Sequence, residues 1–508
     1  MSIRVHNTLS GRKEDFVPAD GSRVRIYVCG VTPYSTTHIG HARPSVFWDV
    51  VRRYLEYRGY RVFLVQNFTD VDDKVIAKAQ TTGEDPLAVA RAYSHEYLEL
   101  MDRLGVQRAD VYPRVSDHIE DVVRVVEGLV DRGAAYARDG NVFFDVTSFP
   151  GYGKLSRRTP DDLRAGARVE VDEAKKNPAD FALWKRAKPG EPAWPSPWGP
   201  GRPGWHIECT AMALKYLGDG FDFHGGGTEL VFPHHENEIA QAEAYTGRAP
   251  FCRNWLHHEM VNLRGEKMSK SLENFVPLRE VLERAPAPAV RLLLLGAHYR
   301  KPVDFDFELL EENKRAWRRL SEAAGRLRET LRESGEARPA ATGSGPSAAG
   351  LRPSAAGSAP AAAATGSSLA AAAAEARRRF EAAMDDDFNT AEALAALFDL
   401  ARRVNAELAA GAVESSDPGG VRAALEAMEE LGAGVLGVLD AGEQVDATGP
   451  GGGGAAEVDG LLRLLVEVRD RLRAEKNYGL ADHIRDSLIA LGYEVQDGPG
   501  GTAARRRD

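Results

Sequence analysis

The chain has 508 residues, more than one hydrophobic core usually organises, so we expect two to four domains. A formal net charge of -10 argues against a protein coated with basic residues for non-specific nucleic-acid binding, although it does not exclude a local basic groove. Three cysteines, at positions 29, 209 and 252, cannot form a disulfide framework. They indicate a reducing cytoplasm and favour metal or catalytic roles. The N-terminal residues lack the apolar stretch of a signal peptide, and no apolar run is long enough to cross a membrane.

The first clear pattern is a strand, a helix and a second strand between residues 23 and 65. The β-branched run RVRIYV at 23–28 predicts the first strand. Apolar pairs then recur at helical spacing up to residue 55, and Gly59 stands where a glycine often ends a helix. The run 62–65 predicts the next strand. This order predicts a parallel sheet of the kind that binds nucleotides at the carboxyl ends of its strands.

Two histidines mark the passage from the first strand to its helix. His38 and His41 are three residues apart, so on a first helical turn both rings would face the same way. The free amide groups and the dipole of such a turn attract phosphate, and imidazole groups could add hydrogen bonds. Gly40 has no side chain, so a flat base could lie against its backbone. A polar helix start without a ligand explains the same residues equally well.

A cluster of carboxylates follows the second strand. Asp70, Asp72 and Asp73 could bind magnesium or a ribose, or they could cap helices and face solvent. We favour the caps.

The next two hundred residues change in character twice. The segment 140–204 begins with a predicted strand at 141–146. The rest of it is rich in Gly, Pro and Trp, which indicates an insertion of short strands and turns. The α/β pattern resumes at 205–209, and a helix at 210–218 and a strand at 221–227 are predicted to follow. Arg264 and Gly265 mark a hairpin-like turn.

The C-terminal half is predicted to be helical, with two interruptions. Helical patterns cover 279–335 and 369–439. Between them, residues 338–369 are rich in Ala, Gly, Ser and Pro and cannot bury enough apolar surface to order themselves. A glycine-rich stretch at 441–456 leads to a small terminal module, with helices expected near 457–475 and 481–491 and a basic tail at 505–507.

A second group of charged side chains lies in the run Lys-Met-Ser-Lys-Ser. Lys267 and Lys270 are three residues apart, and their ammonium groups could follow charge that develops on a breaking triphosphate. Taken alone, such a run is usually a solvated turn.

Four residues far apart in the chain are plausible zinc ligands: Cys29, Cys209, His234 and Glu238. His234 and Glu238 are four residues apart, so on a helix they would share a face. Cys29 follows the first strand and would meet ligands from other strand ends. Ligands so widely spread have no local pattern, which makes the spacing by itself a weak indication. Cys252 has no partner in this set and is interpreted as a small buried residue.

The His-Ile-Gly-His and Lys-Met-Ser-Lys-Ser runs together resemble the two signatures of class I aminoacyl-tRNA synthetases. The wider pattern resembles the cysteinyl-tRNA synthetases. The matching segments are 27–30, 38–43, 67–74, 204–209, 232–238, 267–271, 384–390 and 476–486. The likeness covers nearly the whole chain apart from the two low-complexity linkers.

The resemblance implies an α/β fold: a Rossmann-like parallel-sheet catalytic domain with an inserted connective segment, an α-helical anticodon-binding domain and a small C-terminal module. The expected divisions are 1–260 for the catalytic domain with 140–204 inserted, 261–335 for the Lys-Met-Ser-Lys-Ser loop and a helical stem-contact region, 336–369 for a flexible linker, 370–440 for the helical tRNA-binding domain, 441–456 for a glycine-rich linker and 457–508 for a tRNA-binding module.

The resemblance also implies an activity, ATP-dependent activation of L-cysteine and its transfer to the 3′-terminal adenosine of tRNA(Cys), in a cytoplasmic monomer. His38, His41, Lys267 and Lys270 would act on the phosphates of ATP and its Mg²⁺, with Gly40 under the adenine.

In the family, one Zn²⁺ per chain would be held by Cys29, Cys209, His234 and Glu238 and would select the thiol substrate, since zinc favours sulfur. Cys29, Thr69 and Trp205 would enclose the cysteine; for Trp205, packing in the core is the alternative. His235 is left unassigned.

The chain departs from the family pattern at three places. Val31-Thr32-Pro33 stands where Pro-Thr-Val is usual, and Glu229 stands where an aspartate is usual. The tail lacks the tryptophan commonly found before its arginines, so no aromatic residue is assigned to the anticodon.

Two other functions fit part of the pattern. A ligase that joins cysteine to an amino sugar would share the adenylation site, but it would lack the helical C-terminal half. A non-catalytic, RNA-binding relative would not need intact His38, His41, Lys267 and Lys270.

Overall fold

The computed structural model describes residues 2–158, 175–267, 275–334, 368–409 and 417–440, and parts of 465–506. The chain divides into two compact units, Met1–Gly442 and Glu443–Asp508. Lys270 and the two predicted linkers, except for the last residues of the first, lie outside the described residues. None of the helices in the described part is long and apolar enough to cross a membrane.

The first unit is built on a sheet of four parallel strands in the order β10-β9-β3-β4. The strands are β3 (Arg23–Val28), β4 (Arg61–Gln66), β9 (Phe221–Gly227) and β10 (Cys252–His258), and α1 (Ile39–Tyr57) connects β3 to β4. The predicted strand-helix-strand unit is therefore confirmed. Gly59, with φ of 85°, follows the end of α1. The Rossmann-like parallel sheet that we expected is present.

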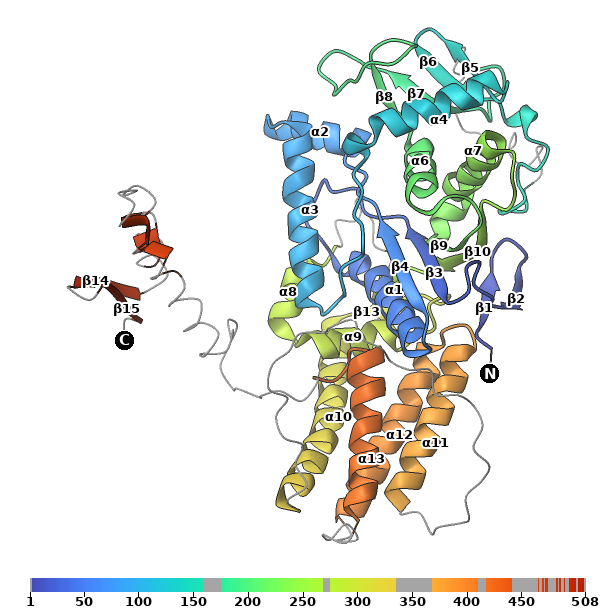
Figure 1. Cartoon of the computed structure of the whole chain (residues 1–508). Coiled ribbons are helices and arrows are strands. Elements are labelled where there is room, and N and C mark those ends of the chain that lie inside the picture. The colour runs from blue at the N-terminus through green and yellow to red at the C-terminus, as the bar shows by residue number, and fades with distance from the viewer. Residues whose placement is uncertain are drawn as a thin grey trace. The chain divides into compact units, whose positions relative to one another are not determined.

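Further helices lie around the parallel sheet and the inserted segment, and one of them contains a stretch that the sequence pattern had separated from it. The helices are α2 (Asp73–Thr82), α3 (Pro86–Arg103), α4 (Ile119–Asp131), α6 (Trp205–Leu217) and α7 (Glu236–Thr246), with a short helical turn η1 (Val115–Asp117) (Figure 1). Residues 205–209 were predicted to precede the helix, but they form its first turn and a half. Gly204 is the N-cap residue, so the helix begins directly after it. Cys209 consequently lies on a helix.

The inserted segment forms an antiparallel sheet in the order β5-β6-β7-β8, as its turn-rich sequence indicated. Its strands are β5 (Ala135–Arg138), β6 (Asn141–Phe144), β7 (Phe181–Arg186) and β8 (Gly201–Pro203), with η2 (Val146–Ser148) after β6. Trp184 and Phe144 are fully buried and give this sheet its core.

Two small sheets and two helices complete the part of the unit around the parallel sheet. They are β1 (Arg4–Asn7) with β2 (Arg12–Asp15), β11 (Val261–Leu263) with β12 (Glu266–Lys267) and β13 (Val303–Phe305), and the helices α8 (Leu278–Arg284) and α9 (Ala287–Leu295). The turn predicted at Arg264 and Gly265 joins β11 to β12, and both residues have positive φ.

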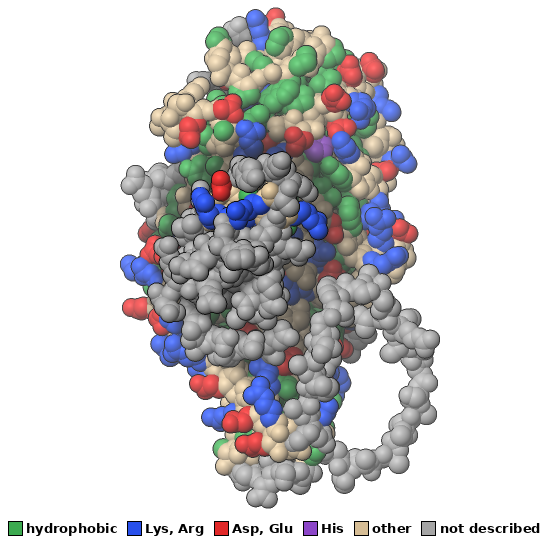
Figure 2. Space-filling view, turned by 60° about the vertical axis from the view of Figure 1, so that its left-hand side comes forward, with side chains coloured by type: hydrophobic (Ala, Val, Ile, Leu, Met, Phe, Trp, Pro, Cys, Tyr) green, Lys and Arg blue, Asp and Glu red, His purple; other side chains and the backbone are tan. Residues whose placement is uncertain are grey.

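Four long helices form a bundle at one end of the first unit (Figure 1): α10 (Phe307–Glu333), α11 (Ser368–Asp385), α12 (Thr390–Ala409) and α13 (Pro418–Met428), which continues as η6 (Glu429–Val435). Phe380, Leu397 and Met428 are buried between them. The face in Figure 2 carries Lys and Arg side chains interspersed with Asp and Glu.

In the second unit the described strands are β14 (Tyr493–Gly498) and β15 (Gly501–Arg506), which pair as an antiparallel hairpin. The sequence pattern of 457–507 predicted only helices followed by a basic tail. Arg505 and Arg506 of that tail instead lie in β15, which pairs with β14 from Gly501 opposite Gly498 to Arg506 opposite Tyr493.

Candidate functional site

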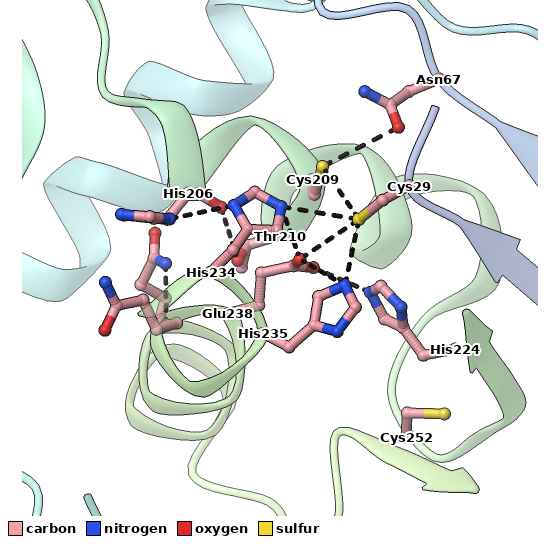
Figure 3. Close-up of polar contacts among 12 residues, drawn as sticks. Cys29, Asn67, His206, Cys209, Thr210, His224, His234, His235, Glu238 and Cys252 are labelled. Carbon is pink, nitrogen blue, oxygen red and sulfur yellow. Dashed lines mark hydrogen bonds and ion pairs between the residues drawn. The ribbon is translucent and has the colours of Figure 1, made fainter. Parts of the chain in front are cut away.

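The four predicted metal ligands come from four separate segments and meet at one point (Figure 3). Cys29 follows β3, Cys209 lies on α6, His234 lies in η4 (Val231–His235), and Glu238 lies on the first turn of α7. The Sγ atom of Cys29 is 3.8 Å from Cys209 Sγ and 3.5 Å from His234 Nε2. His234 Nε2 is 3.0 Å from Glu238 Oε1. Folding thus brings together residues whose spacing in the chain gave no local pattern.

The donor chemistry and the charges of this cluster fit a zinc ion. Two sulfurs, one imidazole nitrogen and one carboxylate oxygen form a four-donor set that zinc binds. The hydrogen bond with Cys29 lowers the pKa of Cys209 to about 6, although burial opposes this. Burial would also raise the pKa of Glu238, but His224 and His234 outweigh it and lower that pKa to about 2. Cys209 and Glu238 are therefore readily ionised, as metal ligands must be. Burial raises the pKa of the Cys29 thiol, and against the effect of burial Glu238 and Cys209 raise the pKa of His234 to about 10, so a bound metal would displace the protons of Cys29 and His234.

Residues without a predicted role contact the ligand side chains and the loop after β3. His206 Nδ1 lies 3.0 Å from His234 Nδ1, and His224 Nε2 lies 2.9 Å from the second carboxylate oxygen of Glu238. The side-chain oxygen of Asn67 accepts a hydrogen bond from the Gly30 amide, which fixes the loop after β3. Such partners orient ligand side chains and fix histidine tautomers.

His235 is buried beside the cluster. Its Nε2 atom is 3.3 Å from Cys29 Sγ, and its Nδ1 atom is 2.7 Å from His257 Nε2. His257 Nδ1 in turn lies 2.8 Å from the Thr8 hydroxyl group. No spacing in the sequence indicated these contacts, because His224 and His257 lie on the strands β9 and β10, which only the folded sheet brings side by side.

Thr69 and Trp205, the predicted cysteine-binding residues besides Cys29, differ in exposure. Thr69 is 3% exposed, and its hydroxyl accepts a 3.2 Å hydrogen bond from the Asn67 side-chain amide. Trp205 is 41% exposed, with its ring centroid 4.5 Å from that of His234. The alternative that Trp205 is a core residue is therefore wrong. Its indole ring stands at the surface next to a candidate ligand.

The two histidines of the first signature lie at the start of α1, as predicted, and their rings stack with centroids 3.7 Å apart. His38 is the N-cap residue, and its ring also stacks on Phe275. A cleft of about 350 Å³ is lined by His38, Gly40 and His41 and also by Cys29. Of the four candidate ligands, Cys29 therefore reaches the space that the candidate nucleotide residues line.

The first turn of α1 was expected to offer free backbone amides to a phosphate, but two of these amides are already hydrogen-bonded. The amide of Ile39 donates to Val276 O, and the amide of His41 donates to His38 O. These amides are not free for phosphate, so a phosphate would depend more on the side chains. Burial lowers the pKa of His38 to about 4, and burial together with His38 lowers the pKa of His41 well below its usual value of 6.5. Both rings are neutral near pH 7 and can donate one N–H each.

The second signature begins at the end of β12. The backbone of Lys267 pairs with Asn262 there, while Lys270 lies outside the described residues. The chain is described again from Phe275, which stacks on His38, and Pro277 forms a bridge with His38. The residues that follow the run in the described chain, Phe275 and Pro277, therefore lie at the first turn of α1.

The aspartate cluster after β4 has structural partners. Asp70 accepts hydrogen bonds from the backbone and hydroxyl of Ser116, and Asp72 caps α2. Asp73 pairs with Arg202 and with Lys185. The helix-capping interpretation is confirmed for Asp72.

Glu229, one of the three departures from the family pattern, lines the same cleft as His38.

Comparison with known proteins assigns the chain to a family. Residues 15–315 match the model described as tRNA synthetases class I (C) catalytic domain, and residues 379–440 match the DALR domain. A cysteine–tRNA ligase of Moorella thermoacetica is 50% identical, with 99% of both chains covered. One from Carboxydothermus hydrogenoformans is 47% identical over 99% of this chain and all of its own.

Among solved structures, the methionyl-tRNA synthetase of Mycobacterium tuberculosis in complex with methionyl-adenylate has a similar fold. It aligns with a TM-score of 0.58 and 17% sequence identity, covering 82% of this chain and 90% of its own. An alignment at this identity supports the fold alone. The full-length matches at close to half identity decide the family: this chain belongs to the cysteine–tRNA ligases, a family of class I aminoacyl-tRNA synthetases.

Proposed function

We propose that this chain activates L-cysteine with ATP and transfers it to the 3′-terminal adenosine of tRNA(Cys). The observation that carries the proposal is the shared cleft, lined by Cys29 of the metal cluster and by His38, Gly40 and His41 at the start of α1. An amino acid held through its side chain at the cluster would present its carboxylate towards a nucleotide on the first turn of α1. A reaction between these two groups needs such proximity.

The residues around α1 would bind ATP and stabilise the charge that develops during adenylate formation. His38 and His41 are neutral near pH 7 and would donate N–H groups to phosphate oxygens. Gly40 would leave room for the adenine. Lys267 and Lys270 would close over the leaving pyrophosphate together with Mg²⁺ as counter-charge. The stacking of Phe275 on His38 supports this arrangement, since Phe275 follows the lysine-containing run closely in the sequence and lies at the same turn.

The metal cluster, which Cys29 joins to the cleft, would select the amino acid. Cys29, Cys209, His234 and Glu238 would hold a zinc ion, which when bound would favour a thiolate over the hydroxyl of serine. A hydrophobic pocket discriminates near-isosteres by only about 10²-fold, so a metal–sulfur contact would add selectivity that packing cannot. Trp205, exposed beside His234, would cover the bound side chain, and Thr69 would support the pocket wall.

The helical bundle and the second unit would bind tRNA. The DALR match covers 379–440, which spans the last part of α11, from residue 379 to its end, and all of α12 and α13. An amino-sugar ligase would not need this half, and the relatives match over their whole length. These two facts favour a tRNA substrate.

ATP–pyrophosphate exchange driven by cysteine or by serine tests the activation step. We expect exchange with cysteine and almost none with serine. The matched variant is Cys29→Ser, which removes a donor shared with the cleft, and Cys252→Ser is its control because Cys252 is buried away from the cluster. Equal exchange in Cys29→Ser and in the unmodified chain would contradict the role of the cluster in selecting the thiol.

A further inference from the structure

A second group of four side chains next to the predicted ligands can also hold a metal ion. It consists of Cys29, His224, His235 and Glu238, and its donor atoms all lie within 4.8 Å of one another. The two groups share Cys29 and Glu238. They differ because His224 and His235 take the places of Cys209 and His234 (Figure 3).

The shared residues face both groups at once. Glu238 directs one carboxylate oxygen to His234 Nε2 at 3.0 Å and the other to His224 Nε2 at 2.9 Å. Cys29 Sγ lies 3.5 Å from His234 Nε2 and 3.3 Å from His235 Nε2. These separations are those of neighbouring ligands around one tetrahedral ion, since zinc–nitrogen and zinc–sulfur bonds are about 2.0–2.3 Å long. A metal between either set of donors needs little movement of side chains.

Outer partners prepare His235 for this role without any change of charge. When the Thr8 hydroxyl accepts the Nδ1 proton of His257, His257 Nε2 can accept the Nδ1 proton of His235. The Nε2 atom of His235 then keeps its lone pair towards Cys29, as a metal ligand requires. In the reverse direction of the same chain, Nε2 carries the proton and donates to the Cys29 sulfur. The chain of hydrogen bonds is satisfied either way.

The backbone leaves space for the ring of His235, and one ring nitrogen of His224 has no hydrogen bond within the described residues. A β-carbon at Gly226 would lie 2.5 Å from the His235 ring, so the glycine leaves room for it. His224 and His235 are both completely buried, and His224 Nδ1 has no hydrogen-bond partner in the described part of the chain. Only the Nε2 side of His224 is engaged, with Glu238.

We infer that the metal centre has two overlapping ligand sets, so that a divalent transition metal remains bound through Cys29, His224, His235 and Glu238 when Cys209 or His234 is lost. This inference rests on the proposed metal centre. It predicts an asymmetry among the ligands: the shared residues Cys29 and Glu238 are indispensable for metal retention, and the unshared residues of each set are individually dispensable.

Cobalt substitution of the full-length chain tests the inference, because thiolate–cobalt charge-transfer absorption reports the number of sulfur ligands. We expect the unmodified chain to bind one Co²⁺ with two thiolates. Cys209→Ser should still bind one Co²⁺ with roughly half of the charge-transfer intensity. His234→Gln should retain the ion through the second set, again with one thiolate ligand and so with reduced intensity. Cys29→Ser and Cys209→Ser/His235→Ala should lose it. Cys252→Ser, outside both sets, should match the unmodified chain.

The outcomes separate the inference from the proposal on which it rests. A folded Cys209→Ser chain that loses Co²⁺ as completely as Cys29→Ser would overturn the second ligand set and leave the zinc centre intact. Retention in the Cys209→Ser/His235→Ala chain would also overturn it, because no complete set remains. Failure of the unmodified chain to bind Co²⁺ or Zn²⁺ would refute the metal centre itself. Near-ultraviolet circular dichroism identifies variants that have not folded, and His234→Gln then replaces Cys209→Ser in the comparison.

Discussion

The hydroxyl group of Tyr54 lies 2.7 Å from the carboxylate of Asp385, and this buried hydrogen bond joins α1 to the helical bundle. Arg58 of α1 pairs with the same carboxylate. The other end of α1 carries His38 and His41. The bundle that would bind tRNA therefore holds the helix on which the proposed ATP site is built.

Replacing Tyr54 by phenylalanine should destabilise the chain by about 1–2 kcal/mol, because a buried acceptor loses one of its donors. Tyr57→Phe is the matched control. Tyr57 also donates to a carboxylate of α11, that of Glu381 at 2.7 Å, but it is only half-buried and water can replace the bond. Urea unfolding of both variants provides the comparison, and an equal loss in the two would contradict the argument from burial.

A second buried contact, between Arg291 of α9 and Asp49 of α1, should matter more. Their charged groups are 2.6 Å apart, and both side chains are at most 1% exposed. Arg291 also donates to Leu436 O at the end of the bundle. Arg291→Met should cost about 2–4 kcal/mol of unfolding free energy, because the buried Asp49 keeps only Arg53 as a cationic partner and the carbonyl of Leu436 loses its donor. The exposed pair of Arg284 and Glu280 gives the reference, and Arg284→Met should cost less than about 1 kcal/mol.

The sequence predicted the helices and strands that depend on interactions between residues close together in the chain. The strand at 23–28, the helix that ends before Gly59 and the strand from Arg61 depend on local periodicity, and all three were predicted. Residues 205–209 were placed outside their helix because Trp, His and Cys have weak helical preference. The helix forms there because Gly204 caps its N-terminus and the side chain of Ile207 is buried. The hairpin of β14 and β15 was missed because its residues carry little apolar alternation.

The candidate site divides in the same way. His38, His41 and the four metal ligands were recognised through their resemblance to a family, and the structure brings the described ones together. His206, His224, His235 and His257 were not assigned, because their importance depends on contacts across the sheet that no sequence spacing reveals.

His41→Asn should slow adenylate formation by about 10²–10³-fold, because a positioned donor to the developing phosphate charge is lost. The shorter side chain keeps a polar group near the His38 amide, which now donates to His41 Nδ1. ATP–pyrophosphate exchange measures the rate, and Co²⁺ content should stay unchanged. His95→Asn, at an exposed position of α3, is the control. An unchanged exchange rate in His41→Asn would refute its role.

Acid should destabilise the folded chain through His258. Burial, with help from Arg43, lowers the pKa of His258 from 6.5 to about 4. Between these two pH values the unfolded chain binds a proton that the folded histidine does not, so the free energy of unfolding falls as the pH is lowered. His258→Gln should reduce this pH dependence by up to about 1.4 kcal/mol per pH unit. Unfolding between pH 4.5 and 6 measures the slope, and above pH 7.5 the two chains should have equal slopes.

The most direct test of the account is charging of a tRNA(Cys) transcript with labelled cysteine, beside a parallel reaction with labelled serine. The account predicts strong charging with cysteine and none above background with serine. Cysteine-dependent exchange of ATP without any charging would instead indicate a ligase with another acceptor, and charging with serine at a comparable rate would contradict selection of the thiol at Cys29, Cys209, His234 and Glu238.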